Sequence, residues 1–338
     1  KIMLAYIHFP DWINPEIIPG LPLRWYGLMY LIAFVITYLL FNYQVKKREL
    51  DVQKDTVLSF FFWGIIGLLI GARLFATLFF DPTHTYLQKP WLIFWPFAEG
   101  RFVGFQGMNY YGGLVGCLIA LIIYCRVKKI KLLDWGDMVL AGVPLGYTFG
   151  RIGNFINAEL FGRVTTAPWG IVFPHARKFP VNQEWVQETA QKIGMELPEK
   201  GFINLPRHPT QLYEAFFEGI VLWLVLWFFF RKRKKFDGYI IGIYIIGYGA
   251  IRFIIDYFRM PISRGDFLLK LSQVPNPPYL LVTPFNFITS QLYSLLMVVG
   301  GVIFFIVTKK IAEQREAKQA EEQGKKKVSM RKLRKKIK

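Results

Sequence analysis

The sequence is poor in cysteine and in acidic residues, and it has no visible internal repeat. Its two cysteines, Cys117 and Cys125, lie in one apolar segment, and neither has a histidine or a second cysteine at metal-ligand spacing. This pattern indicates neither a disulfide framework nor a cysteine-based metal site. Residues 1–20 lack a long apolar core and hold three prolines, which argues against a cleavable signal peptide. The lack of a repeat disfavours the common inverted-repeat transporter designs.

The charge balance is strongly basic. Acidic residues number 23 against 42 lysines and arginines, so the net charge is +19. Much of the positive charge lies in short loops and in the C-terminal tail, and no nucleic-acid recognition motif accompanies it. We therefore interpret the charge as a sign of membrane topology and expect no nucleic-acid partner.

Apolar residues are abundant instead. Hydrophobic residues make up 53% of the chain and charged residues only 19%, whereas ordinary globular domains carry more charge. The apolar residues gather in runs of about 17–25 residues, the length that crosses ~30 Å of hydrocarbon. The sequence thus predicts an all-α polytopic membrane protein with about seven transmembrane segments: 23–41, 59–80, 110–125, 138–154, 213–230, 239–255 and 287–308.

Alternate loops predict the orientation of these segments. The first, third and fifth loops and the tail are dense in lysine and arginine, which marks the cytoplasmic side. The N-terminus is then outside and the C-terminus cytoplasmic. The predicted parts are an extracytoplasmic N-terminal segment (1–22), helices one to four (23–161) with an outer arm (81–109), an extracytoplasmic head (162–209), helices five to seven (210–308) with an outer loop (256–286), and a basic cytoplasmic tail (309–338) that we expect to be disordered.

Polar side chains fall at one end of these helices. Helices that alternate in direction would spread randomly placed polar residues over both ends, but here they gather at the outer ends. A charge near hydrocarbon costs several kcal/mol and indicates function, so we expect one polar site in the outer leaflet. Its candidate members are Tyr26, Arg73, Tyr110, Tyr111, Arg151, Asn154, Glu214, Glu218, Arg252, Asp256 and Arg259.

Arginine is the most informative member of this set. Arg252, Asp256 and Arg259 share one helix face, as do Glu214 and Glu218. One interpretation is an ion-pair network that only holds helices together. The other is that the site holds more arginine than such pairing needs, and that the spare guanidinium groups bind the phosphate of an anionic phospholipid.

The chain resembles prolipoprotein diacylglyceryl transferases. The central match is the run from Gly150 to Asn157 that continues through Glu159 to Gly162, which is similar to the family signature. Further matches occur in order along the chain, at 24–30, 71–74, 207–214, 247–253 and 258–259.

This resemblance implies an activity. Members transfer the sn-1,2-diacylglyceryl group of phosphatidylglycerol to the lipobox cysteine thiol of prolipoproteins, which forms a thioether, releases glycerol 1-phosphate and begins bacterial lipoprotein maturation. The implied partners are phosphatidylglycerol, the lipobox segment of the prolipoprotein signal peptide and membrane lipids. The implied location is the bacterial cytoplasmic (inner) membrane, with the active site facing the outer leaflet and with no metal or soluble cofactor.

The resemblance also implies roles for individual residues. Arg151 and Arg252 are the main cations on the lipid, and the substrate-binding positions are Tyr26, Asn154, Glu159, Gly162, Glu214, Tyr248, Asp256 and Arg259. Three residues join the candidates from their place in the chain: Arg73 for substrate binding, because it lies in the outer half of helix two, and Tyr111 and His208 for catalysis, because both lie at outer helix ends.

One position departs from the family pattern. Many members open helix three with Phe-His-Gly-Gly, and that histidine is a proposed base, whereas this chain has Tyr110-Tyr111-Gly112-Gly113. A phenol with a reference pKa of about 10 is a poor base at neutral pH. Three explanations are open: arginine charge favours the thiolate without an imidazole, His208 replaces the missing base, or Tyr111 only orients the phosphate. We favour the first combined with the third.

Two other functions remain in consideration. A lipid or solute transporter would move its substrate without modifying it, but its site is expected near the bilayer midplane rather than at the outer end of the helices. A different membrane transferase acting on lipid phosphate would be told apart by its product.

Overall fold

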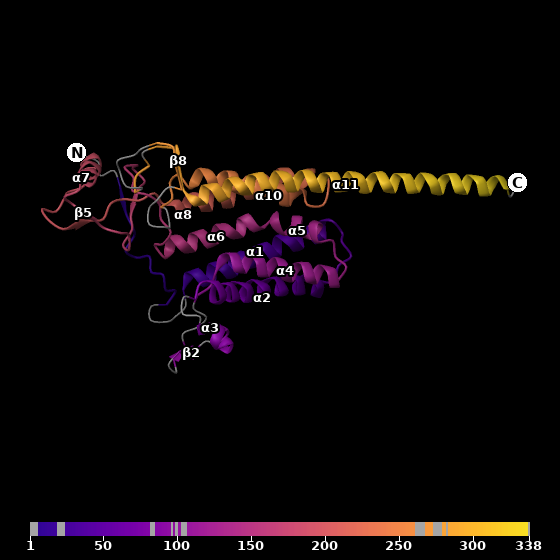
Figure 1. The fold of residues 1–338 in the computed structure, drawn as a ribbon, viewed down its shortest axis with the longest axis horizontal. Helices are drawn as coiled ribbons and strands as arrows, with labels where there is room; N and C mark the ends of the chain where they lie inside the picture. The colour runs from indigo at the N-terminus through magenta and orange to yellow at the C-terminus, as the bar shows by residue number, and fades with distance from the viewer. Residues whose placement is uncertain are drawn as a thin grey trace. The chain divides into compact units, whose positions relative to one another are not determined.

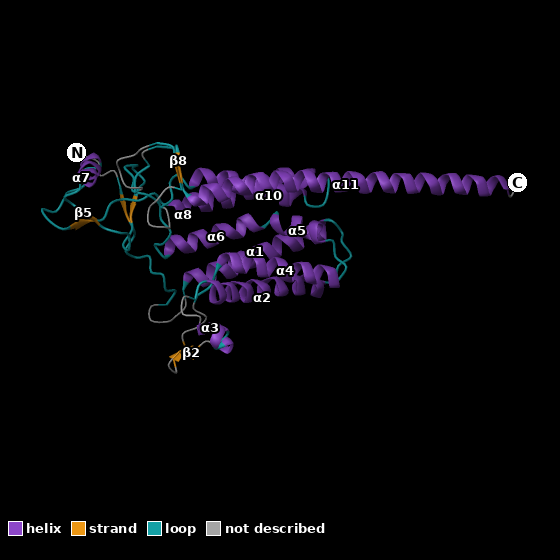
Figure 2. Ribbon diagram, viewed as in Figure 1, coloured by secondary structure: helices purple, strands orange, loops and turns teal. Residues whose placement is uncertain are grey.

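The computed structural model describes residues 6–18, 24–81, 85–95, 97–98, 101–102, 107–260, 268–272, 279–281 and 283–336. The chain divides into two compact units, one made of Lys1–Leu39 and Asp137–Lys338 and the other of Leu40–Gly136. Helices dominate both units, and the strands are short pairs (Figure 2).

The predicted helical membrane class is confirmed. By length and composition, five helices in the described part of the chain can cross a membrane: Trp25–Lys47 (α1), Lys54–Phe79 (α2), Tyr110–Val127 (α4), Thr210–Arg233 and Thr289–Gln323 within α11. Tyr239–Ile255 (α10) is a shorter apolar helix. A helix suits such runs because it satisfies its own backbone hydrogen bonds in lipid. The predicted total of seven spans and the direction of the termini stay predictions.

The fourth predicted segment, 138–154, is not one helix. It is divided between Leu132–Leu140 (α5) and Val143–Ile156 (α6), with Gly142 between them and Pro144 in the first turn of α6. Proline has no N–H to donate and is tolerated at the start of a helix but not inside it. The break between α5 and α6 therefore falls just before the proline.

The fifth predicted segment is helical but irregular. It begins with Thr210–Tyr213 (α8) and continues as the π-helix Glu214–Val221 (η2), Leu222–Leu224 (α9), the π-helix Val225–Phe230 (η3) and the 3₁₀ turn Arg231–Arg233 (η4). A π-helix has a wider turn than an α-helix, is rare, and occurs frequently at functional sites. Both acidic residues of this segment, Glu214 and Glu218, lie in η2.

The last helix is longer than the sequence suggested. Helix α11 runs from Thr289 to Lys336, packs beside α10 and extends well past the N-terminal end of α10 (Figure 1). This differs from the disordered tail expected for 309–338. The residues beyond 308 are mostly lysine, glutamate, arginine, glutamine and alanine, all good helix formers, and proline is absent there.

In the unit Leu40–Gly136, α2 and α4 lie side by side (Figure 1). Glycines make this close approach possible, because a Cβ atom on Gly71 or Gly116 would collide with the backbone of α4 or α2. Helix α4 begins at Asn109, whose side chain accepts a hydrogen bond from the Gly112 N–H at 3.1 Å. The unit also contains the helix Thr85–Gln88 (α3), the 3₁₀ helix Pro90–Ile93 (η1), and strands Phe97–Ala98 (β2) and Arg101–Phe102 (β3), which pair antiparallel.

The other unit carries the remaining strands and a small helix. Ile7–His8 (β1) pairs parallel with Ile171–Val172 (β4), Phe179–Pro180 (β5) antiparallel with Phe202–Ile203 (β6), and Leu269–Lys270 (β7) antiparallel with Asn286–Phe287 (β8). Strands β5 and β6 and the helix Glu184–Lys192 (α7) contribute to a core around Phe179, Trp185 and Leu205. Most of the segment predicted as a head therefore has a hydrophobic core of its own. Its boundaries and its side of the membrane stay predictions.

The start of α10 is fixed by a buried carboxylate. Asp137 accepts hydrogen bonds from the backbone N–H groups of Gly238, at 2.9 Å, and Ile241, at 3.0 Å, and it pairs with Lys234 at 2.9 Å. Gly238 has a φ of 95°, which glycine adopts without strain. These contacts hold the start of α10 against Asp137, which lies in the chain segment that leads to α6.

Candidate active site

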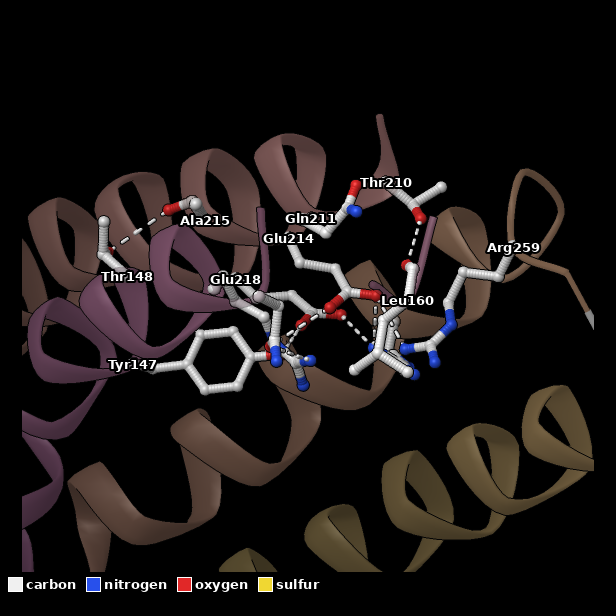
Figure 3. A network of polar contacts seen from close by, with 12 residues as sticks. Tyr147, Thr148, Leu160, Thr210, Gln211, Glu214, Ala215, Glu218 and Arg259 are labelled. Carbon is white, nitrogen blue, oxygen red and sulfur yellow. Dashed lines mark hydrogen bonds and ion pairs between the residues drawn. The ribbon is translucent and has the colours of Figure 1, made fainter. Parts of the chain in front are cut away.

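Three elements of one unit bring the predicted charged residues together. Arg151 and Asn154 come from α6, Glu214 and Glu218 from η2, and Arg252 from the end of α10, with Asp256 and Arg259 just after it. Figure 3 shows the labelled carboxylates of Glu214 and Glu218 pointing into one cluster between these elements. Residues far apart in the sequence thus form one polar network.

Glu214 is the centre of this network. Its Oε2 atom lies 2.9 Å from Nε of Arg151, and its Oε1 atom lies 2.9 Å from Nη1 of Arg252 and 2.7 Å from Nη1 of Arg259. The Glu214 side chain is 1% exposed. A buried carboxylate that pairs with three arginines holds their guanidinium groups within a few ångströms of one another.

Two more carboxylates belong to this network. Asp256 Oδ1 lies 3.2 Å from Nε of Arg252 and 3.7 Å from Nε of Arg259, and Glu218 Oε1 lies 3.5 Å from Nη1 of Arg252. The charge of a fourth arginine, Arg163, also acts on Asp256. The surplus of arginine expected from the sequence stays a prediction.

The exposed part of this network is cationic. The side chains of Arg151 and Arg252 are 18% and 14% exposed, whereas those of Glu218 and Asp256 are fully buried. Among the described contacts, none uses the Nη2 atom of either arginine. An anion that contacts this network would therefore contact guanidinium N–H groups rather than these two carboxylates.

Amide groups extend the network along α6. Arg151 Nη1 donates to Asn154 Oδ1 at 3.3 Å, and Asn154 Nδ2 donates to Glu159 Oε1 at 2.9 Å. The backbone just beyond the helix is tied to α8. Thr210 Oγ1 donates to the Leu160 carbonyl at 3.1 Å (Figure 3), and Gln211 Nε2 donates to the Glu159 carbonyl. The signature segment is thereby anchored to the helix that carries Glu214.

Gly162 lies where three segments meet. Its N–H donates to the His208 carbonyl at 2.8 Å, and it pairs as an isolated bridge with Arg259. A Cβ atom here would lie 2.7 Å from the methyl group of Thr210 and would collide with the Phe258 carbonyl. Only glycine fits where these segments cross, which is a physical reason for the glycine at the last position of the signature run.

His208 lies next to this crossing but is engaged elsewhere. Its Nδ1 atom is 3.1 Å from the hydroxyl of Tyr213, and that hydroxyl accepts a hydrogen bond from Trp169 Nε1 at 2.6 Å. Nδ1 of His208 and the hydroxyl of Tyr213 thus share one hydrogen bond beside Trp169. Burial, reinforced by the nearby charge of Arg163, lowers the pKa of His208 to about 4. An imidazole with so low a pKa is a weak proton acceptor for a thiol with a reference pKa of about 8.5.

Tyr26 and Tyr248 also lie near this cluster. A Cβ atom on Gly153 would be 3.4 Å from the Tyr26 ring, and the Tyr26 hydroxyl is 2.9 Å from that of Tyr30. The ring of Tyr248 meets that of Tyr147 edge to face, with centroids 5.9 Å apart. Both predicted tyrosines therefore contact the helix α6 that carries Arg151.

Arg73 and Tyr111 belong to the other unit. Arg73 is buried, donates from Nε to the Ile93 carbonyl at 2.6 Å, and packs over the Tyr86 ring with 5.1 Å between Cζ and the centroid. These contacts join α2 to the arm around α3 and η1. Tyr111 is exposed at the start of α4. Their membership in the site stays a prediction.

Sequence reasoning missed Tyr147. Its hydroxyl donates to Glu218 Oε2, and the Arg151 guanidinium lies over its ring with 4.6 Å between Cζ and the centroid. One signal could have found it, because Tyr147 precedes Arg151 by four residues and shares its helix face.

Comparisons with known proteins agree with the resemblance. Residues 15–307 match the family model described as "Prolipoprotein diacylglyceryl transferase". Curated proteins with the name phosphatidylglycerol--prolipoprotein diacylglyceryl transferase are similar over most of the chain. The one from Treponema pallidum is 46% identical over 89% of this chain and 94% of its own length, and the one from Treponema denticola 44% over 93% and 98%. The corresponding protein of Chlorobaculum tepidum is 38% identical over 90% and 93%.

Proposed function

Because the chain belongs to the prolipoprotein diacylglyceryl transferase family, we propose that it transfers the diacylglyceryl group of phosphatidylglycerol to the lipobox cysteine of prolipoproteins. This is the first step of lipoprotein maturation. The observation that carries the proposal is the convergence of Arg151 and Arg252, from α6 and α10, on one carboxylate, at 2.9 Å each. Two guanidinium groups held this close suit one phosphodiester.

The proposed reaction is a displacement at carbon. The cysteine thiolate attacks the glycerol carbon that carries the phosphate ester, a C–S bond forms, the C–O bond breaks, and glycerol 1-phosphate leaves with the electron pair. Arg151 and Arg252 stabilise the negative charge that develops on the leaving phosphate. Glu214 acts indirectly by fixing both cations, so little reorganisation is needed when the charge appears.

The proposed chemistry needs no imidazole base. The low pKa of His208 and its hydrogen bond with Tyr213 disfavour it as the acceptor of the thiol proton. Positive charge near a cysteine lowers its thiol pKa and increases the thiolate fraction. We assign this effect to Arg151 and Arg252, and we assign to Tyr111 at most a hydrogen bond that orients the phosphate.

We place the reaction at the outer leaflet of the cytoplasmic (inner) membrane of a bacterium. Basic loops on the opposite side of the predicted spans support this orientation. The phosphate of a lipid in that leaflet would then lie at the depth of the Arg151 cluster, next to a prolipoprotein signal peptide that crosses the bilayer.

One experiment tests the function directly. Purified full-length protein is incubated with phosphatidylglycerol and a lipobox peptide, and the peptide is then weighed by mass spectrometry. We expect a mass gain equal to one diacylglyceryl group on the cysteine, and none on a matched peptide with serine at that position. Another product on the peptide would favour a different lipid-phosphate transferase, and movement of unmodified lipid across the membrane would favour a transporter.

A further inference from the structure

The two main arginines have matching aromatic neighbours. Tyr147 precedes Arg151 by one turn on α6, and Tyr248 precedes Arg252 by one turn on α10. The two rings meet edge to face at 5.9 Å and 88°, a favourable geometry for an aromatic pair. Together they form an aromatic layer one helical turn below the arginines. The family resemblance assigns a role to Tyr248, whereas nothing assigns one to Tyr147.

The ring of Tyr147 restrains the plane of one guanidinium group. The Cζ atom of Arg151 lies 4.6 Å from the ring centroid, so the cation stacks over the face of the ring. Glu214 and Asn154 hold two of its nitrogens from the sides. A guanidinium that is fixed at its face and at two nitrogens has one edge left for a ligand.

The hydroxyl of Tyr147 restrains the second arginine indirectly. It donates to Oε2 of Glu218 (Figure 3). The Oε1 atom of Glu218 is 3.5 Å from Nη1 of Arg252. The same Nη1 atom lies closer to Glu214, at 2.9 Å. The hydrogen bond from the Tyr147 hydroxyl weakens the pull of Glu218 on Arg252, because a buried carboxylate without that donor would draw the neighbouring guanidinium groups more strongly towards it.

Close helix packing keeps Tyr147 in place. The next residue, Thr148, donates from Oγ1 to the Ala215 carbonyl of η2 at 3.3 Å (Figure 3). Gly219 faces Thr148 so closely that a Cβ atom there would collide with the threonine hydroxyl. These contacts set the rotation and depth of α6 against η2, and thus the distance between the Tyr147 hydroxyl and Glu218.

We propose that Tyr147 is a positioning residue for the phosphate site. Its ring orients Arg151, and its hydroxyl occupies Glu218 so that Arg252 stays directed towards the lipid phosphate. The inference rests on the proposed function, but it concerns anion binding and can be tested through binding alone.

The test compares Tyr147→Phe, which keeps the ring and removes the hydroxyl, with Tyr147→Leu, which removes both. Full-length protein in detergent is titrated with short-chain phosphatidylglycerol, and transfer to a lipobox peptide is measured on the same samples. We expect Tyr147→Phe to raise both Kd and KM for the lipid about 10-fold with a smaller change in kcat. Tyr147→Leu should lower kcat about a further 3- to 10-fold, because no aromatic ring then holds the orientation of the Arg151 guanidinium plane. Tyr293→Phe, at an exposed tyrosine on α11, is the matched control and should change neither constant.

A double-mutant comparison separates positioning from a general effect on folding. If the hydroxyl acts through Glu218, adding Tyr147→Phe to Glu218→Gln should change Kd by less than about 2-fold. If Tyr147→Phe folds poorly, Glu218→Gln tests the same hydrogen bond by changing the acceptor instead of the donor. Additive losses in the double variant, or an unchanged Kd and KM in Tyr147→Phe, would overturn the proposal. Wild-type protein that binds the lipid without modifying the peptide would refute the transferase function while the Kd comparison still decides the role of Tyr147.

Discussion

Replacing Glu214 by glutamine should destabilise the protein strongly. The substitution keeps the size of the side chain but removes the charge that pairs with Arg151, Arg252 and Arg259 at 2.7–2.9 Å. Since the carboxylate is 1% exposed, water cannot replace it. Removing one partner of a buried ion pair costs about 3–5 kcal/mol, because the remaining charges stay buried and uncompensated.

The same substitution one turn further along η2 provides a matched control. Glu218 faces one arginine, at 3.5 Å, and one tyrosine hydroxyl. Glu218→Gln should therefore cost less, about 1–3 kcal/mol. The assay is chemical unfolding of each variant in detergent micelles, with the free energy of unfolding compared with wild type.

Added lipid distinguishes a phosphate site from a purely structural ion-pair network. In Glu214→Gln three guanidinium groups face only two carboxylates, so an anionic ligand should bind the folded state more favourably and restore part of the lost stability. Phosphatidylglycerol should do so, whereas zwitterionic phosphatidylcholine should not. Equal costs for Glu214→Gln and Glu218→Gln would refute the central role given to Glu214. Equal effects of both lipids would support the network that only holds helices together.

Three further predictions concern catalysis and pH. Arg151→Ala or Arg252→Ala should abolish peptide lipidation while the protein still inserts into the membrane, and normal lipidation by either variant would remove the proposed role. Tyr111→Phe and His208→Ala should each retain near-normal initial rates, and a large loss in one of them would identify that side chain as the base or its partner. The pKa of His208 is about 4 in the folded protein and near its ordinary value of 6.5 in the unfolded chain. As the pH falls through this range, the unfolded chain takes up a proton on His208 before the folded protein does, so the folded state loses stability. Between pH 7.5 and 5.0 wild type should lose about 2 kcal/mol more than His208→Gln in the same unfolding assay, and parallel curves for the two proteins would contradict this.

Much of the fold could be predicted from one-dimensional features. The length of an apolar run decides whether it can span hydrocarbon, and the seven predicted segments are largely helical in the structure, the fourth as two helices. The family, too, was identifiable from short motifs, since the comparisons confirm it over residues 15–307. What could not be predicted are the local breaks in these helices. The division at Pro144 and the π-helix at Glu214–Val221 depend on how neighbouring helices satisfy backbone groups.

The sequence by itself determined which polar residues are present in the apolar segments, and therefore that guanidinium and carboxylate groups must share a site. Only the tertiary structure decided their pairing. Contacts between α6, η2 and α10 depend on the rotation and depth of each helix, which hydrophobic run length does not encode. For that reason the central position of Glu214, the pairing of Glu218 with Arg252 and the contacts of Tyr147 emerged only when the helices were assembled.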